Sequence, residues 1–225
     1  MKKIGLYEEF AYVLGLILLG FGTAFMEKSD FGLSMIVAPA YILHVKISQY
    51  LPFFSFGMSG YVLQTFLLII LCLVIRKFKL KFLMSFATAV IYGFVLDGCI
   101  MLFNFIPSDQ LVLKIIYYIV GVVISDAGVA FLFKTYISPE VYDLFVKEIT
   151  ERFGLKLNRV KTIYDCASLL VAILLSLILF GLNVPVGIGI GTVICALVNG
   201  TLIGFFTKRY DKTFTYKRFL RVRGD

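Results

Sequence analysis

Six apolar runs, separated by more polar segments, dominate the pattern of hydrophobic and polar positions along the chain. A helix that crosses about 30 Å of hydrocarbon needs about 20 residues at about 1.5 Å each, and all six runs are close to that length. The predicted spans cover residues 10–27, 57–75, 82–105, 111–133, 163–182 and 186–206. The pattern therefore predicts an all-α membrane protein with six transmembrane helices.

The composition agrees with this pattern and excludes a soluble globular domain. Hydrophobic residues make up 60% of the 225 positions, charged residues make up 16%, and the mean hydropathy is +0.94. The four cysteines all fall inside apolar runs without a C-x-x-C pair, and we interpret them as small packing residues. The chain has one histidine, no zinc-ligand spacing and no catalytic triad. We therefore expect no metal, no cofactor and no enzymatic activity.

The net charge of +8 is explained by where the cations lie. Nineteen of the 22 Lys and Arg residues fall in the N-terminal segment, the connections after the second and fourth spans, and the C-terminal tail. The opposite set of segments holds only Lys28, Lys46 and Lys114. Because Lys and Arg collect on the cytoplasmic side, both termini are predicted to be cytoplasmic. The basic tail, residues 208–225, is interpreted as contacting anionic lipid of the bilayer and no nucleic acid.

Two connections are long enough to hold further structure. Residues 33–43 form an apolar piece that is too short to cross the bilayer and is interrupted by Pro39. We predict that this piece is re-entrant or lies flat on the outer side. Residues 138–153, on the inner side, repeat apolar positions at helical spacing after Pro139. They are predicted to form an amphipathic helix at the membrane interface with a solvated charged face.

The chain contains signs of an internal duplication. The motif G-x-A-F-x-x-K occurs at residues 22–28 and again at residues 128–134, each time at the end of an apolar run. Small residues of the third span align with the sixth span at an offset of 107, and residues 56–58 align with residues 153–155 at an offset of 97.

Each half then contains three spans. The halves are residues 1–107 and residues 108–207, and an odd number of spans makes the second half enter the membrane from the opposite side. The sequence therefore predicts two inverted-topology three-helix repeats. Many secondary transporters use this architecture, although some channels and simple bundles share it.

Two acids lie deep inside predicted spans. Asp97 is about 15 residues into the third span and Asp126 is about as far into the fourth, which is roughly 22 Å at the helical rise. A charged side chain near the centre of a span costs about 2.5–3.5 kcal/mol on insertion scales, so we expect both acids to point into the bundle or a wet cavity. Each is either a candidate proton carrier or a buried acid held by hydrogen bonds, for example to Ser125 or Asn199.

Five further polar residues are candidates for a solute or proton site. Gln64 and Asn199 lie within spans and are expected to line a cavity. Asp165 follows a lysine by four residues, so it either pairs with that lysine on one helix face or favours the helix dipole. Lys28 and Lys134 close the two copies of the repeated motif on opposite sides, where they either gate an anionic solute or extend to the interface.

A glycine-rich stretch, residues 186–192, opens the sixth span. No strand–turn–helix unit surrounds it, so a dinucleotide site is excluded. We expect its glycines to allow either an unwound or a closely packed helix start, whose amides could meet a solute.

These residues resemble the YczE/YyaS/YitT group of bacterial multi-pass membrane proteins. The resemblance is strongest over residues 186–200, and it is supported by Ser138-Pro139-Glu140 with Asp143-Leu144, by residues 159–165, and by residues 28–34 in the first half. The chain departs from the group at Asp165, where glutamate is usual, and at residues 35–37, which replace a common Trp-Asp pair. The group is largely uncharacterised, so the resemblance implies a bacterial cytoplasmic membrane protein without an established activity.

The inverted repeats and the intramembrane acids favour a small-solute secondary transporter or exporter. The alternative is a non-transporting solute-binding or regulatory subunit that acts with a partner complex. The expected partners are the lipid bilayer, an unknown small solute, and either a second copy of the chain or another membrane protein.

Overall fold

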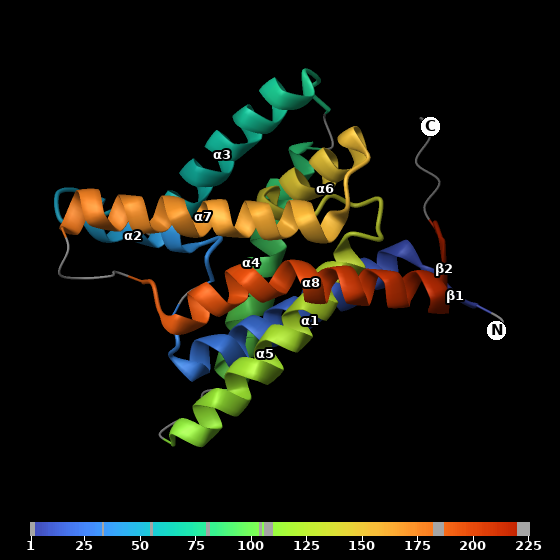
Figure 1. Ribbon diagram of the computed structural model, residues 1–225, viewed down its shortest axis with the longest axis horizontal. Coiled ribbons are helices and arrows are strands. Elements are labelled where there is room, and N and C mark those ends of the chain that lie inside the picture. The colour runs from blue at the N-terminus through green and yellow to red at the C-terminus, as the bar shows by residue number, and fades with distance from the viewer. Residues whose placement is uncertain are drawn as a thin grey trace.

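The computed structural model describes residues 3–32, 34–54, 56–79, 82–103, 105, 110–181 and 187–219. Within these ranges the chain forms eight helices and two short strands (Figure 1). The elements are β1 (Ile4–Tyr7), α1 (Glu8–Ser29), α2 (Ala38–Ile47), α3 (Phe56–Ile75), α4 (Met84–Phe103), α5 (Leu111–Leu132), α6 (Val141–Phe153), α7 (Leu157–Phe180), α8 (Ile190–Thr213) and β2 (Phe214–Lys217). The predicted boundary between the halves, the start of the sixth run at Val186 and the end of the tail, residues 220–225, lie outside the described residues.

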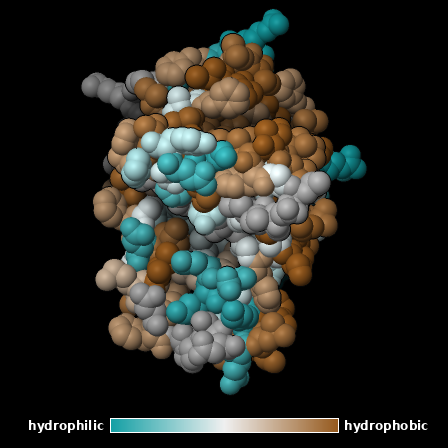
Figure 2. All heavy atoms as spheres, turned by 90° about the vertical axis from the view of Figure 1, so that its left-hand side faces the viewer, coloured by the Kyte–Doolittle hydropathy of each residue, from teal (hydrophilic) through white to brown (hydrophobic). Residues whose placement is uncertain are grey.

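The prediction of six apolar helices is confirmed, because α1, α3, α4, α5, α7 and α8 are all long and apolar enough to cross a membrane. Their outer surfaces carry large exposed apolar side chains such as Phe94, Ile178 and Ile190. Figure 2 shows such residues covering much of one face, with hydrophilic residues gathered in patches. This surface suits lipid better than water, so the protein is a multi-pass membrane protein.

The ends of two spans differ from the prediction. Helix α7 begins at Leu157 instead of residue 163, and α8 continues to Thr213 instead of ending at residue 206. Both extensions contain charged residues, so a prediction based on apolar runs leaves them out of the span. A helix can nevertheless continue through such residues, either beyond the hydrocarbon or where ion pairs bury them.

Helices α1 and α5 form the central contact of the molecule, and glycines bring their backbones together. A methyl group on Gly22 would lie 2.6 Å from the carbonyl oxygen of Gly121, and one on Gly15 would lie 3.0 Å from that of Gly128. The partner number falls along α5 as the number rises along α1, so the two helices run antiparallel. Small residues of this kind allow close packing where lipid offers little hydrophobic driving force between helices.

The two short helices, α2 and α6, both pack on α3 and α7. We predicted that Pro39 interrupts the apolar piece. It instead lies in the first turn of α2, where a missing backbone N–H does no harm, so it helps to begin a helix. The predicted amphipathic helix is present as α6, but it begins at Val141 and its apolar face is covered by protein. Val141 and Leu144 pack against Leu68 and Leu71 of α3, so α6 is part of the bundle.

The two ends of the described chain meet in a small parallel sheet that the sequence did not indicate. Strand β1 pairs with β2, with Ile4 opposite Phe214 and Tyr7 opposite Lys217. The predicted basic tail is therefore largely structured, since residues 208–213 extend α8 and residues 214–217 form β2.

Candidate functional site

A lysine buried inside the bundle is the centre of the candidate site. Lys161, in the second turn of α7, has a side chain only 2% exposed. Its Nζ lies 3.0 Å from Oδ1 of Asp143 on α6 and 3.2 Å from Oδ1 of Asp165, one turn along α7. The expected same-face pair of Asp165 with a lysine is thus confirmed. One ammonium group is shared by two buried carboxylates.

A third carboxylate, Asp126 of α5, lies beside this group. It is 2% exposed and close enough to interact electrostatically with Lys161, Asp165 and Asp143. Its Oδ2 has no hydrogen-bond partner among the described residues. Ser125, which we considered as a partner, instead donates its hydroxyl to the carbonyl oxygen of Val122 at 3.1 Å. The expectation that Asp126 points into the bundle is confirmed.

Glu140 is the fourth carboxyl of the group and precedes the first turn of α6. Burial is the main cause that raises its pKa to about 8, and the nearby negative charge of Asp143 adds to the rise. Lys161 opposes the rise. Glu140 therefore keeps its proton near neutral pH. We call Glu140, Asp143, Asp126, Asp165 and Lys161 the buried charge cluster.

The cluster holds more acid than base. Four ionised carboxylates beside one ammonium would carry a charge of −3, and unpaired buried charge costs several kcal/mol per ion. The excess must be neutralised by protons or by a cation. No group of three or more His, Cys, Asp or Glu residues in the described part of the chain is arranged to hold a metal ion. The chemistry available to the cluster is proton uptake and release, or recognition of a cationic group.

Neighbouring helices hold α6 in place beside the cluster. Gln64 of α3 hydrogen-bonds the hydroxyl of Tyr142, whose pKa is raised chiefly by burial. Thr88 of α4 donates to the carbonyl oxygen of Ser138 at 2.7 Å, and its hydroxyl also lies 2.8 Å from that of Tyr12. The segment before α6 is therefore bonded to α4 directly and to α1 through Thr88.

Asp97 does not lie where we predicted. It is exposed on the outer face of α4, whereas Asp126 and Asp165 are inside the bundle. Helix α4 packs chiefly on α1, and α3 packs on α2 and α6, so this face of α4 stays uncovered.

The remaining predicted residues are dispersed. Asn199 of α8 is partly buried and its Oδ1 has no partner among the described residues, while Gln64 borders the cluster through Tyr142. Lys134 forms an ion pair of 2.7 Å with Asp211. Lys28 borders a cavity of about 100 Å³ at the other end of the molecule. Lys28 and Lys134 therefore do not join the buried charge cluster.

Three members of the cluster are not among the site residues that the sequence predicts. The sequence offers Lys161 only as a same-face partner of Asp165 and as one of the cytoplasmic cations, assigns Asp143 to a solvated helix face, and gives Glu140 a place only in the family resemblance. The family resemblance carries the signal that could have identified these three residues. Two of the stretches that show the resemblance, residues 138–144 and residues 159–165, meet at the cluster.

The other two stretches that show the family resemblance, residues 28–34 and residues 186–200, also contact each other. The N–H of Gly191 donates to the carbonyl oxygen of Phe31 at 2.9 Å, and Gly189 packs on Phe31 and Gly32 with no room for a methyl group. An open groove of about 380 Å³ runs beside them, lined by residues 30–32 and 187–190. The expected close packing of the glycines is confirmed. The amide of Gly191 is occupied by the protein and is not offered to a solute.

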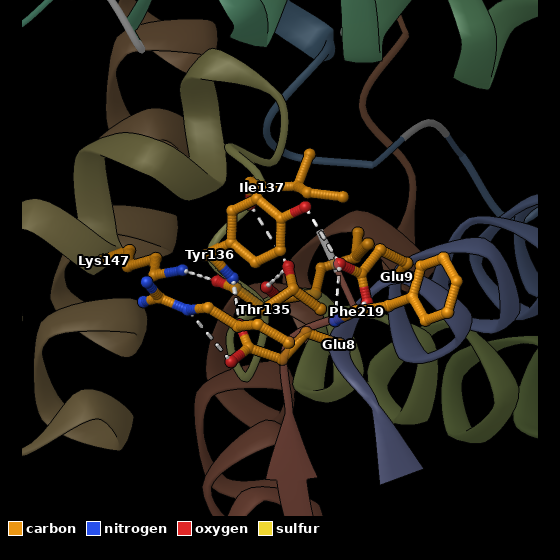
Figure 3. Close-up of polar contacts among 9 residues, drawn as sticks. Glu8, Glu9, Thr135, Tyr136, Ile137, Lys147 and Phe219 are labelled. Carbon is orange, nitrogen blue, oxygen red and sulfur yellow. Dashed lines mark hydrogen bonds and ion pairs between the residues drawn. The ribbon is translucent and has the colours of Figure 1, made fainter. Parts of the chain in front are cut away.

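A polar clamp ties the two ends of the chain to the segment between α5 and α6 (Figure 3). Glu8 accepts the backbone N–H of Tyr136 at 2.6 Å and pairs with Arg218 at 3.4 Å. Glu9 accepts the hydroxyl of Tyr136 at 3.0 Å and the backbone N–H of Phe219 at 3.2 Å. Three parts of the chain distant in sequence are thus held at one end of α1.

No curated protein and no solved structure matches this chain. A family described as a family of unknown function, DUF6198, matches residues 6–208. That match covers five of the apolar helices in full, most of α8, and the whole buried charge cluster. The chain therefore belongs to this family.

Proposed function

We propose that this protein is a secondary transporter or exporter of a small solute, in the cytoplasmic membrane of a bacterium, with proton movement at the buried charge cluster. The observation that carries the proposal is the cluster itself: Lys161 with four carboxyls, inside a helical membrane bundle. Buried ionisable groups in membrane helices commonly mark ion or substrate pathways. The proposal involves no catalysis and no cofactor.

We further propose that the halves are inverted-topology repeats with both termini in the cytoplasm. Helices α1 and α5 are the first helices of the two halves. Their antiparallel packing supports inverted repeats, because equivalent helices then cross the membrane in opposite directions. Two side-chain contacts support the repeat as well. The hydroxyls of Tyr12 and Thr88 lie 2.8 Å apart, and the hydroxyl of Tyr118 lies 3.0 Å from Sγ of Cys195. Tyr118 follows Tyr12 by 106 residues and Cys195 follows Thr88 by 107, the same offsets as in the sequence. The likeness to the YczE/YyaS/YitT group is compatible with this architecture.

In this scheme Asp126 is the proton-carrying group. Its Oδ2 has no partner among the described residues, and its charge interacts with that of the shared lysine, so uptake of a proton changes the charge that Lys161 must balance. Asp143 lies on α6 and Asp165 on α7, so this change alters the attraction between two helices. A solute bound nearby would compete for the same charges.

Proteoliposomes that contain a pH-sensitive dye test the proposal. Purified protein should dissipate an imposed pH gradient when a pool of small metabolites is added, and Asp126→Asn should abolish this flux. The matched control is Glu151→Gln, the same kind of change at an exposed position of α6, which should leave the flux unchanged. Absence of flux from folded wild-type protein that co-purifies with a stoichiometric partner would instead favour the regulatory subunit.

A further inference from the structure

The seam between α7 and α8 is closed by small residues at one-turn spacing. A methyl group on Gly204 would lie 2.8 Å from Cβ of Asn158, and Gly200 has no room for one against Thr162. One turn further on, Sγ of Cys166 lies 3.6 Å from the carbonyl oxygen of an α8 alanine. The three contact pairs are Asn158–Gly204, Thr162–Gly200 and Cys166–Ala196.

The corresponding seam of the first half, between α3 and α4, is open at the positions that match these three contacts. At an offset of 97, Tyr61, Thr65 and Ile69 of α3 correspond to Asn158, Thr162 and Cys166 of α7. The first three are exposed, whereas their counterparts are partly buried.

This difference is confined to one side of the helix. Gln64, Leu68 and Ile75 of α3 are buried, and so are their counterparts Lys161, Asp165 and Ala172. The two helices therefore bury matching faces, except for the stripe that α8 covers on α7.

The facing stripe of α4 is open as well. Gly93 and Asp97 correspond to Gly200 and Gly204 at an offset of 107. Apart from the backbone of α4 itself, no atom of the described residues lies within 4 Å of a Cβ built on Gly93, and Asp97 is exposed. A carboxylate on a lipid-facing span is costly, so Asp97 needs a polar partner, and none of the described residues provides one in this conformation.

We infer that α3 closes on α4 in a second conformation, in which Tyr61 meets Asp97 and Thr65 meets Gly93. The occupant of the open stripe on α4 is thus a segment of the same chain. The inference rests on the inverted repeats proposed above, and it adds the residues that change partners. Tyr61 stands where α7 has Asn158, and Asp97 stands where α8 has glycine, so the Tyr61 hydroxyl donates to the Asp97 carboxylate. That bond gives the exposed acid its partner.

Disulfide formation tests the closed seam directly. Thr65→Cys with Gly93→Cys is made in a chain without Cys72, Cys99, Cys166 and Cys195, with a protease site inserted between Lys77 and Phe78. After oxidation in native membranes and proteolysis, a cross-link keeps the α1–α3 fragment joined to the α4–α8 fragment on a non-reducing gel. The matched control is Phe66→Cys with Gly93→Cys, because Phe66 lies at the same depth and its counterpart Ile163 is 69% exposed.

We expect the Thr65 pair, and Tyr61→Cys with Asp97→Cys, to cross-link at least several-fold more than the Phe66 pair. A disulfide that joins two copies would place a second molecule on α4 and overturn the inference, and so would equal, background cross-linking of all pairs. If the cysteine-free chain does not fold, the same pairs are compared in the native background, where test and control share the four cysteines. The readout does not depend on flux, so a closed seam without proton movement would refute transport and leave the inference standing.

Discussion

At the scale of single residues, Lys161 is held by its neighbours' charge and not by solvent. Its ammonium group balances Asp143 and Asp165 at 3.0 and 3.2 Å, with side chains that are at most 8% exposed. Removing one partner of a buried ion pair leaves an uncompensated charge and costs about 3–5 kcal/mol. Lys161→Met should therefore lower the free energy of unfolding by about that amount, measured by denaturant titration in detergent.

The control for that change is Lys134→Met. Lys134 pairs with Asp211, but its side chain is 22% exposed and that of Asp211 is 53% exposed, so solvent screens the pair. We expect a loss below about 1 kcal/mol. Adding Asp143→Asn and Asp165→Asn to Lys161→Met should restore most of the stability, because it removes the stranded charges. Equal losses for Lys161→Met and Lys134→Met would contradict the buried pairing.

Glu140 gives the cluster a pH dependence. Its pKa is about 8 in the folded protein against an ordinary 4.5, with burial as the main cause. The folded state therefore keeps a proton that the unfolded state loses above pH 4.5. Stability from this group is complete below that pH, falls as pH rises, and levels off above about 8. Glu140→Gln should narrow the fall in melting temperature between pH 5 and pH 8.5, and a constant difference between variant and wild type would disprove the assignment.

At the scale of elements, the contact between α1 and α5 depends on glycines. A methyl group on Gly22 would lie 2.6 Å from a backbone oxygen of α5, which cannot move aside as a side chain could. Gly22→Ala should therefore force the helices apart and lower the melting temperature of the detergent-solubilised protein. Gly98→Ala on α4, where no atom of the described residues beyond the helix's own backbone lies within 4 Å of the added carbon, should leave it unchanged or raise it slightly. A smaller effect at Gly22 than at Gly98 would contradict the close crossing.

Elements with a long apolar signature could be predicted, whereas those formed by a few residues could not. All six spans follow from length and hydropathy, but β1 and β2 have four residues each and pair across more than 200 residues of chain. The predicted fifth span begins after Lys161 because a charged residue ends an apolar run, although its two carboxylate partners let α7 extend around it. The sequence predicts that Asp97 points into the bundle, because a lone acid is unfavourable in lipid. Its exposure follows from the open seam beside α4, which depends on how the helices pack and which no local sequence pattern encodes.

At the scale of the whole molecule, the two ends of the α1–α5 pair are held unequally. At one end Glu8 and Glu9 bind the backbone N–H groups of Tyr136 and Phe219. At the offset of 106, Glu8 corresponds to Lys114 and Tyr136 corresponds to Asp30. At the other end, Nζ of Lys114 lies 3.4 Å from Oδ2 of Asp30 in an ion pair, and the side chain of Asp30 is 84% exposed. An exposed pair of this kind contributes little, so the direct polar tie between the α1 and α5 segments is weaker at that end.

Amide hydrogen exchange should reveal this inequality. Glu8→Gln with Glu9→Gln weakens the charge-assisted bonds to the amides of Tyr136 and Phe219, so both amides should exchange faster than in the wild-type protein. Glu27→Gln, an exposed change at the other end of α1, serves as the control and should alter neither amide. Because the clamp joins both chain ends to the segment before α6, the faster exchange should extend over residues 134–138 and 214–219 together. Faster exchange at only one of these segments would mean that the three parts of the chain open independently, and the clamp would then hold no end of the bundle closed.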